Sequence, residues 1–244
     1  MNDAPLLLIT RPIADAKPLS ERVRTLGYDT LIHPLLDIHP LPTAAMPLEG
    51  VQALLATSAN GIRALGHHPA IATARPLPLF AVGPATKEAA RHTGFTDIHQ
   101  SAGDGEALAQ LVMEHLKPSS GPLLHLAGQI TSGILARRLS AQGFEMRRST
   151  LYDARPVETL SADVCARLKD HTINGILFYS ARTADVFMTL YGKAGLGVSV
   201  LSSITAYCLA PPVARTLQSG GFGTIVTAPH PDEQALLSCL PPIS

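Results

Sequence analysis

Leu55-Ala56-Thr57-Ser58-Ala59-Asn60-Gly61 is a short apolar run that ends in small polar residues and continues into an amphipathic segment. This pattern predicts a buried strand followed directly by a helix. It recurs along the chain, and strands that alternate with helices predict an α/β fold with parallel sheets covered by helices on both faces. The expected strands are 6–10, 28–33, 51–57, 79–82, 97–101, 123–127, 144–151, 175–179, 205–209 and 224–228. The expected helices are 13–26, 60–65, 84–93, 105–116, 132–142, 160–168, 182–190, 211–218 and 232–240.

The opening motif has a counterpart further along the chain. Leu177-Phe178-Tyr179-Ser180-Ala181 repeats the pattern of Leu55 to Ala59 122 positions later. Phe80 to Thr86 has a counterpart 127 positions later, and Gly27-Tyr28 has one 116 positions later. Because these offsets differ little, we infer a duplicated unit of about half the chain. Two five-stranded sheets are then more natural than a single sheet of about ten strands.

The duplication permits two domain arrangements. Each repeat could fold by itself, with a split near the loop Pro118–Pro122. Alternatively, the first two strands could join the last three and leave a central domain at 43–147. The Pro-rich segment 34–42, too rich in Pro for a central strand, and the segment 152–156 would then be paired crossovers. These two composition breaks favour the second arrangement.

The composition narrows the classes of function. The chain has 244 residues, 46% of them hydrophobic and 16% charged, so it is not disordered. Its 19 Lys and Arg balance 19 Asp and Glu, which argues against nucleic-acid binding through a basic surface. No apolar run is long enough to span a membrane, and Met1 to Pro5 lack the basic residues of a secretory signal. Three scattered cysteines predict reduced thiols in a cytoplasmic protein.

Small and polar residues gather where the predicted strands end and the helices begin. In a parallel α/β sheet this edge binds ligands, and free N–H groups at a helix start attract anions. Helix capping alone would also explain the Ser, Thr and Asp at these turns, so any single turn is weak evidence. The turns are Thr57–Gly61, Gly83–Thr86, Ser101–Gly105, Gly128–Thr131, Tyr179–Thr183 and Ala210–Pro212.

Motifs for other chemistries are absent or incomplete in the sequence. No His or Cys spacing predicts a metal site, and Ser58 lacks the glycines of a nucleophile elbow. The Gly-x-Gly pairs at Gly103 and Gly195 lack the third glycine of a dinucleotide site. Arg11, just past the first strand, suits an anionic group but also suits a solvated helix start. Tyr152 could donate a hydrogen bond or a proton, or simply pack.

Taken together, these motifs in this order resemble the uroporphyrinogen-III synthase family. The resemblance runs from about Leu6 to Leu240 and depends on order and spacing, since no single motif is specific. The matching stretches are Leu8–Pro12, Thr57–Gly61, Ala81–Thr86, Leu151-Tyr152, Tyr179-Ser180 and Thr227–Pro229.

The resemblance implies two flavodoxin-like domains, each with a five-stranded parallel sheet. Domain 1 would comprise 1–37 and 153–244, domain 2 would comprise 43–147, and 38–42 with 148–152 would form a two-stranded connector. It also implies a cofactor-free and metal-free enzyme that cyclises hydroxymethylbilane, a small-molecule substrate with eight carboxylates. Ring D is inverted and water is lost, giving uroporphyrinogen III. We expect a cytoplasmic monomer without nucleic-acid or membrane partners, whose two lobes close on the substrate.

The resemblance also suggests site residues. Tyr152 matches the important tyrosine of the family's connector and is expected to assist departure of the hydroxyl group. Thr86, Ser58 and Ser180 match residues that face the substrate. The expected substrate-binding set is Arg11, Thr57, Ser58, Ala59, Asn60, Val82, Gly83, Thr86, Gly128, Ser180, Ala181, Arg182 and Pro212.

One turn departs from the family pattern. Ala210-Pro211-Pro212-Val213 stands where a second Gly-Pro-x-Thr-like turn is expected, and Pro212 has no N–H to donate. This departure leaves binding at that loop in doubt. Two alternatives to the synthase remain: a non-catalytic bilobal ligand-binding module that kept the fold, and a sugar-phosphate or nucleotide enzyme on a similar sheet.

Overall fold

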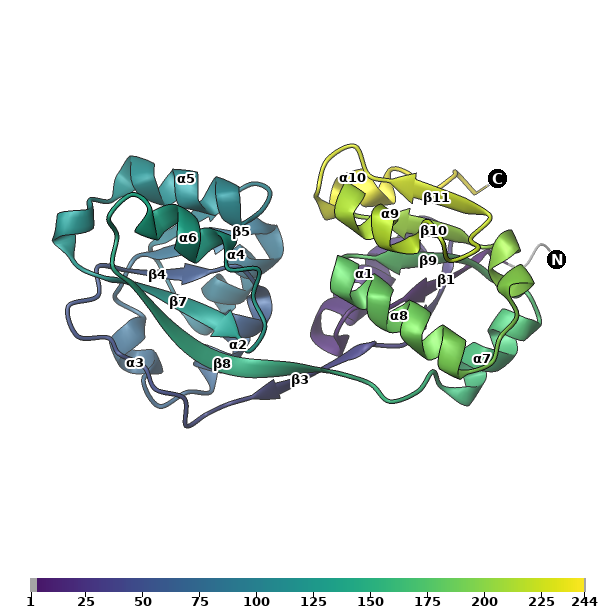
Figure 1. Cartoon of the computed structure of the whole chain (residues 1–244), viewed down its shortest axis with the longest axis horizontal. Coiled ribbons are helices and arrows are strands. Elements are labelled where there is room, and N and C mark those ends of the chain that lie inside the picture. Colours follow the sequence, from purple (N-terminus) through teal and green to yellow (C-terminus); the bar gives the residue numbers. More distant parts are fainter. Residues whose placement is uncertain (1–3, 244) are drawn as a thin grey trace. The chain divides into compact units, whose positions relative to one another are not determined.

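The computed structural model describes residues 4–243; Met1 to Asp3, where no secretory signal is expected, lie outside the described residues. It divides into two compact units (Figure 1). Unit 1 comprises residues 1–37 and 155–244, and unit 2 comprises 38–154. The unit borders thus lie within a few residues of the expected connector segments.

Unit 1 contains a five-stranded parallel sheet with the order β11-β10-β9-β1-β2. Its strands are β1 (Leu6–Ile9), β2 (Asp29–Ile32), β9 (Ile173–Phe178), β10 (Thr205–Cys208) and β11 (Thr224–Thr227). Its helices are α1 (Ile13–Thr25), α7 (Ala162–Lys169), α8 (Ala181–Lys193), the 3-10 helix η2 (Val198–Ser203), α9 (Pro211–Leu217) and α10 (Glu233–Leu237).

Unit 2 contains a sheet with the order β3-β8-β7-β4-β5-β6. Its strands are β3 (Leu36–Pro40), β4 (Ala53–Ala56), β5 (Leu79–Val82), β6 (Ile98–Ser101), β7 (Leu123–Gly128) and β8 (Met146–Pro156). Its helices are α2 (Ala59–Gly66), α3 (Ile71–Ala74), α4 (Gly83–Thr93), α5 (Gly105–His115), the 3-10 helix η1 (Pro118–Ser120) and α6 (Ile134–Ser140).

The expectation of two five-stranded sheets is wrong for unit 2, whose sheet has six strands. The extra strand, β3, comes from the Pro-rich segment that the sequence assigned mainly to a linker. It lies at the sheet edge, where a strand needs only one row of hydrogen bonds and therefore tolerates proline. β8 also runs further than expected, so Tyr152 lies within this strand rather than at its end.

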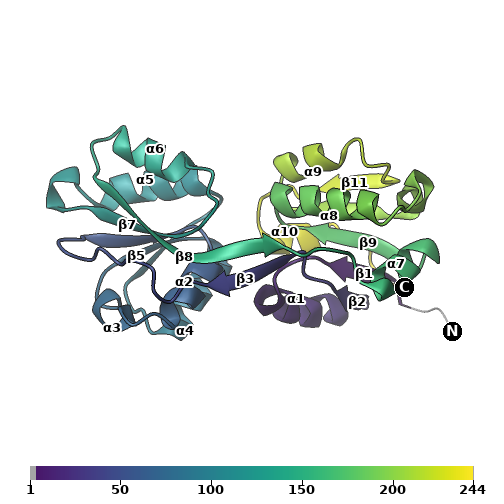
Figure 2. The same cartoon turned by 60° about the horizontal axis from the view of Figure 1, so that its bottom comes forward.

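The central strands of both sheets are buried on both faces, because side chains that alternate along each strand pack against helices on opposite sides. In unit 1, Leu8 and Ile176 pack with residues of α7, α8 and α9, whereas Leu7 and Leu177 pack with residues of α1 and α10. In unit 2, α2, α3 and α4 cover one face, and α5 and α6 cover the other (Figure 2). Parallel sheets require this coverage, and the α/β class expected from the sequence is confirmed.

The strand orders agree with the internal repeat. Reading unit 1 from β2 to β11 gives β2-β1-β9-β10-β11, and the corresponding strands of unit 2 are β8-β7-β4-β5-β6. In this comparison β4 is equivalent to β9 and β5 is equivalent to β10, as the repeated motifs at Leu55 and Phe80 require. In both sheets these strands are parallel, so all their carboxyl ends lie at one edge.

Candidate functional site

The expected site residues of unit 2 lie in three places at or near the carboxyl edge of its sheet. Thr57 to Asn60 join β4 to α2, Val82 to Thr86 join β5 to α4, and Gly128 ends β7 beside Tyr152 of β8. Because β4, β5 and β7 are parallel neighbours, the sheet brings these three places together.

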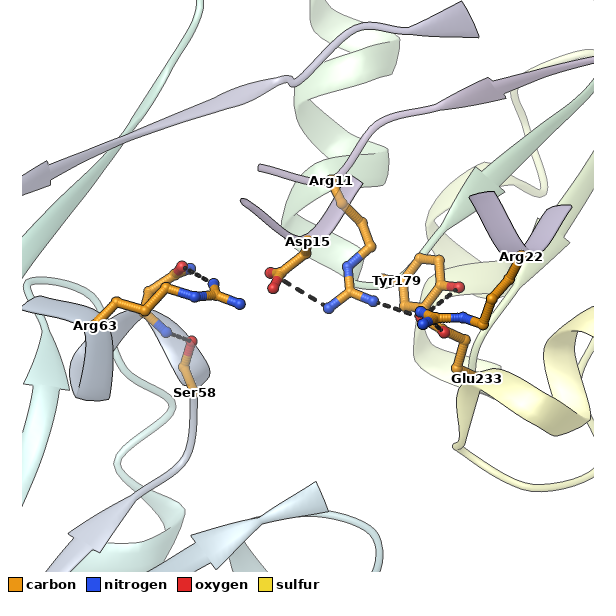
Figure 3. A network of polar contacts seen from close by, with 8 residues as sticks. Arg11, Asp15, Arg22, Ser58, Arg63, Tyr179 and Glu233 are labelled. Atoms are coloured by element: carbon orange, nitrogen blue, oxygen red, sulfur yellow. Dashed lines mark hydrogen bonds and ion pairs between the residues drawn. The ribbon is translucent and has the colours of Figure 1, made fainter. Parts of the chain in front are cut away.

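Ser58 is the side-chain cap of α2. Its Oγ accepts a hydrogen bond from the Asn60 N–H at 3.2 Å, and Asn60 Oδ1 accepts one from Arg63 at 3.0 Å. Figure 3 shows this pair of contacts beside the start of the helix. The capping explanation is therefore sufficient for Ser58, and a ligand at this turn would share the hydroxyl with the helix.

The start of α4 is different because it has no side-chain cap. Val82 precedes the helix, Gly83 has a left-handed φ of +74°, and no acidic side chain lies in the first turn. Pro84 contributes no N–H, but the following backbone N–H groups lack a side-chain acceptor. Thr86 is only 4% exposed in this first turn. This helix start has the donors that an anion needs, without an internal carboxylate to compete for them.

Thr57 is exposed and lies 3.3 Å, oxygen to nitrogen, from a buried histidine that the sequence analysis did not single out. That histidine, His125 of β7, is 7% exposed. Burial, with a contribution from the positive Arg148, lowers the pKa of His125 to about 4. The imidazole is neutral at pH 7 and holds the Thr57 hydroxyl without adding charge to the turn. The available signal was one polar residue in the apolar run Leu123-Leu124-His125-Leu126-Ala127.

In unit 1, the expected residues lie at the ends of β1, β9 and β10. Ser180 caps α8 by accepting from the Thr183 N–H at 3.1 Å, as Ser58 caps α2. Ala181 and Arg182 form the first turn of α8. Pro212 is exposed in the first turn of α9, where Pro211 and Pro212 together remove two N–H donors. Unit 1 therefore offers fewer free backbone donors at this turn than unit 2 offers at α4.

Arg11 is neutralised by carboxylates of its own unit. It pairs with Glu233 at 2.8 Å and with Asp15 at 3.3 Å, and its guanidinium carbon lies 4.3 Å from the centre of the Tyr179 ring (Figure 3). Glu233 also pairs with Arg22 and accepts from the Tyr179 hydroxyl at 3.2 Å. Burial and the nearby Glu233 charge raise the pKa of Tyr179 well above its ordinary value, so the phenol stays protonated.

Arg11→Ala separates a binding role from a structural one. We expect the free energy of unfolding to fall by about 1 kcal/mol, because the change removes one partly buried cation from Glu233, which keeps Arg22 and the Tyr179 hydroxyl, and from Asp15. Chemical denaturation measures this loss, and titration with a polycarboxylate anion measures binding. A tenfold weaker affinity with unchanged stability would contradict the structural role and support Arg11 as an anion ligand.

Metal clusters and membrane spans are both missing from the part of the chain that the structure describes. Within residues 4–243, no group of three His, Cys, Asp or Glu side chains could hold a metal ion. Nor does any helix in that range have both the length and the apolar character of a membrane span.

Parallel sheets covered on both faces, with small residues and helix starts at the carboxyl edge, define the class of ligand-binding α/β proteins. The fold is similar to that of uroporphyrinogen-III synthetase from Helicobacter pylori 26695, with a TM-score of 0.61, 17% identity and coverage of 96% of this chain and 97% of that chain. It is also similar to a mutant uroporphyrinogen III synthase from Thermus thermophilus, with a TM-score of 0.57, 15% identity and coverage of 96% and 95%. The family model "Uroporphyrinogen-III synthase HemD" matches residues 17–238, and the chain belongs to this family.

Curated relatives carry related names. A uroporphyrinogen-III synthase of Schizosaccharomyces pombe is 25% identical over 167 residues, which cover 67% of this chain and 61% of the relative. A porphyrin biosynthesis protein HemD of Ruminiclostridium josui is 26% identical over 232 residues, which cover 90% of this chain and 45% of the relative. The chain thus matches between about half and three fifths of the length of these relatives.

Proposed function

We propose that this protein is a uroporphyrinogen-III synthase, a cyclising carbon–oxygen lyase of haem biosynthesis. It converts hydroxymethylbilane to uroporphyrinogen III with inversion of ring D. The observation that carries this proposal is the family match across residues 17–238, which spans both units.

The reaction makes orientation the main task of the protein. The bilane loses its terminal hydroxyl, which leaves with a proton as water, and the remaining azafulvene is an electrophile. Ring D attacks through its substituted carbon and forms a spiro intermediate, which fragments and closes again with ring D inverted. Because the free bilane can also cyclise without inversion, the protein must hold it so that the inverting attack is faster.

Backbone N–H groups suit a substrate with eight carboxylates on a protein of zero net charge. We propose that the uncapped start of α4 binds one of these carboxylates, with Val82, Gly83 and Thr86 around it. The turns at Thr57–Asn60 and Ser180–Arg182 contribute further polar contacts. Pro212 has no N–H and contributes van der Waals contact with the substrate. Arg11 can bind a substrate carboxylate only if its ion pair with Glu233 breaks.

Tyr152 is proposed to assist departure of the hydroxyl group as a hydrogen-bond donor or acid. Within residues 4–243 its own hydroxyl has no hydrogen bond, so it is available to a ligand. We expect Tyr152→Phe to lower kcat on the order of 100-fold, the contribution of a positioned proton donor, with a much smaller change in product binding. Steady-state kinetics with titration of uroporphyrinogen III measure the two effects; an unchanged kcat would contradict the assigned role.

The function itself is tested with hydroxymethylbilane generated in place by its own synthase. Formation of the type III isomer supports the proposal, whereas formation of only the type I isomer at the spontaneous rate rejects it. The second result, combined with tight binding of the tetrapyrrole, would support the alternative of a non-catalytic ligand-binding module. Activity that survives exhaustive chelation supports the proposed absence of a metal cofactor.

Further parts of the assignment are proposals of the same kind. The order β2-β1-β9-β10-β11, repeated in unit 2, supports two flavodoxin-like domains. The Leu41 N–H donates to the Leu151 carbonyl at 2.7 Å, which supports a two-stranded connector at 38–42 and 148–152. Three unpaired cysteines support a cytoplasmic location, and we propose a monomer that binds neither nucleic acid nor membrane.

A further inference from the structure

Tyr152 and its neighbour Leu151 face the same side of the unit 2 sheet. Leu151 is 1% exposed and belongs to the core formed with α2 and α4, and Tyr152 packs against that same core. Consecutive residues of a regular strand point to opposite faces. The strand must therefore be irregular at this point.

The irregularity is an extra residue in β8. Ala127 of β7 lies opposite Thr150, but the next residue, Gly128, lies opposite Tyr152. Leu151 is thus the additional residue of a bulge, which turns the following side chain toward the face it would otherwise leave. Without this bulge Tyr152 would point to the side of α5 and α6.

Gly128 leaves the space into which the Tyr152 ring is turned. A Cβ atom on Gly128 would lie 2.7 Å from Cζ of Tyr152 and 3.0 Å from its hydroxyl oxygen, so the phenol lies directly against the glycine backbone. Gly128 is not among the glycines with a positive φ, so its backbone would accept alanine. Glycine is therefore required at position 128 because a side chain would occupy the space of the Tyr152 ring, and not because of the backbone conformation.

Arg148 holds the backbone on which the ring lies. Its Nη2 donates to the Gly128 carbonyl at 2.5 Å and to the Gln129 carbonyl at 2.7 Å. The Gln129 N–H in turn donates to the Tyr152 carbonyl at 2.9 Å. The end of β7 is thereby held by two side-chain hydrogen bonds and one backbone hydrogen bond to β8.

We propose that Gly128 is a positioning residue that, together with the bulge at Leu151 and the Arg148 contacts, sets where the Tyr152 hydroxyl is presented to the substrate. This inference rests on the proposed function for its catalytic consequence. It changes the expected role of Gly128, which acts through the tyrosine instead of contacting the substrate.

Gly128→Ala tests the proposal. The atoms that the new methyl group meets are the far end of a flexible side chain, so we expect the variant to fold with its tyrosine ring displaced. A displacement on the order of 1 Å at a reacting group can lower a rate about 100-fold, and we expect a fall in kcat of that order with KM changed less than about threefold. Gly192→Ala, an exposed glycine of α8 with nothing within 4 Å of its added Cβ, is the control and should keep full activity.

The double variant Gly128→Ala/Tyr152→Phe distinguishes positioning from substrate contact. If Gly128 acts through the tyrosine hydroxyl, it lowers kcat less than about twofold further once that hydroxyl is gone. If Gly128 contacts the substrate, the two losses multiply, and that result would overturn the proposal.

A spectroscopic measurement tests the placement of the ring independently of activity. The chain has five tyrosines and no tryptophan, so ¹³Cζ-labelled tyrosine gives few signals, and Tyr152→Phe assigns the relevant one. Gly128→Ala should shift the Tyr152 resonance and leave the other four in place. An unmoved Tyr152 resonance refutes the positioning role even if the protein is a synthase, whereas a shifted one in a protein without synthase activity rejects only the proposed function.

Discussion

Gly61→Ala is expected to lower the free energy of unfolding by about 2 kcal/mol, although alanine is the better helix former. A Cβ at Gly61 would lie 2.6 Å from the carbonyl oxygen of Leu126. Both groups belong to the backbone, α2 on one side and β7 on the other, so neither can rotate out of the way. Overpacking of this kind costs about 1–3 kcal/mol and outweighs the helix propensity gained, which is at most about 1 kcal/mol.

Chemical denaturation with Gly192→Ala as the control measures this effect. The control adds the same methyl group to an exposed helix position, and we expect it to be neutral or stabilising by up to about 1 kcal/mol. Because α2 begins at the Thr57–Asn60 turn, the Gly61 variant should also weaken binding of the proposed tetrapyrrole substrate. A stability gain equal to that of Gly192→Ala would show that α2 does not need its close approach to β7.

His125 is expected to make unit 2 less stable in acid. Its pKa is lowered from 6.5 to about 4, so between these values the unfolded chain binds a proton that the folded chain does not. The contribution of neutral His125 to the free energy of unfolding is therefore complete above pH 6.5 and is lost as the pH falls toward 4. The expected loss is about 3 kcal/mol, the free energy that corresponds to this difference in pKa.

The comparison with His125→Gln isolates this contribution, since glutamine cannot titrate. From pH 7 to pH 4, the wild-type protein should lose about 3 kcal/mol more than the variant in free energy of unfolding. Parallel profiles for the wild type and His125→Gln would mean that His125 is protonated in the folded protein.

The α/β class was predictable because parallel sheets buried on both faces leave continuous apolar runs such as Leu6–Ile9 and Ala53–Ala56. The prolines at 34, 40 and 42 exclude a central strand but do not distinguish an edge strand from a linker. The resemblance implied a strand at 38–42 as part of a connector, and its place at the edge of the unit 2 sheet was not expected. The bulge at Leu151 could not be predicted from the sequence either. It depends on the register between β7 and β8, which the pattern within one strand does not specify.

The positions of the candidate residues at strand–helix turns were predictable, but their contacts were not. The serines at 58 and 180 were identified as helix-start residues, and a hydroxyl that caps a helix cannot be told by sequence from one that binds a ligand. One partner of Arg11 is Glu233, 222 positions away, and only the folded chain brings these two residues together. Gly128 was expected to contact the substrate, whereas we propose that it positions Tyr152, and nothing in the sequence indicated this because the ring that covers Gly128 comes from another strand.

The chain order of the two units has a consequence for biosynthesis. Unit 2 is one continuous stretch, 38–154, inserted between the two parts of unit 1. During translation, at roughly 5–20 residues per second, β1 must wait on the order of ten seconds or more for β9, its neighbour on the side away from β2. Unit 2 has by then emerged in full and can fold while the chain is still attached to the ribosome. Until β9 arrives, the open edge of β1 is a place where a chaperone would protect the growing chain.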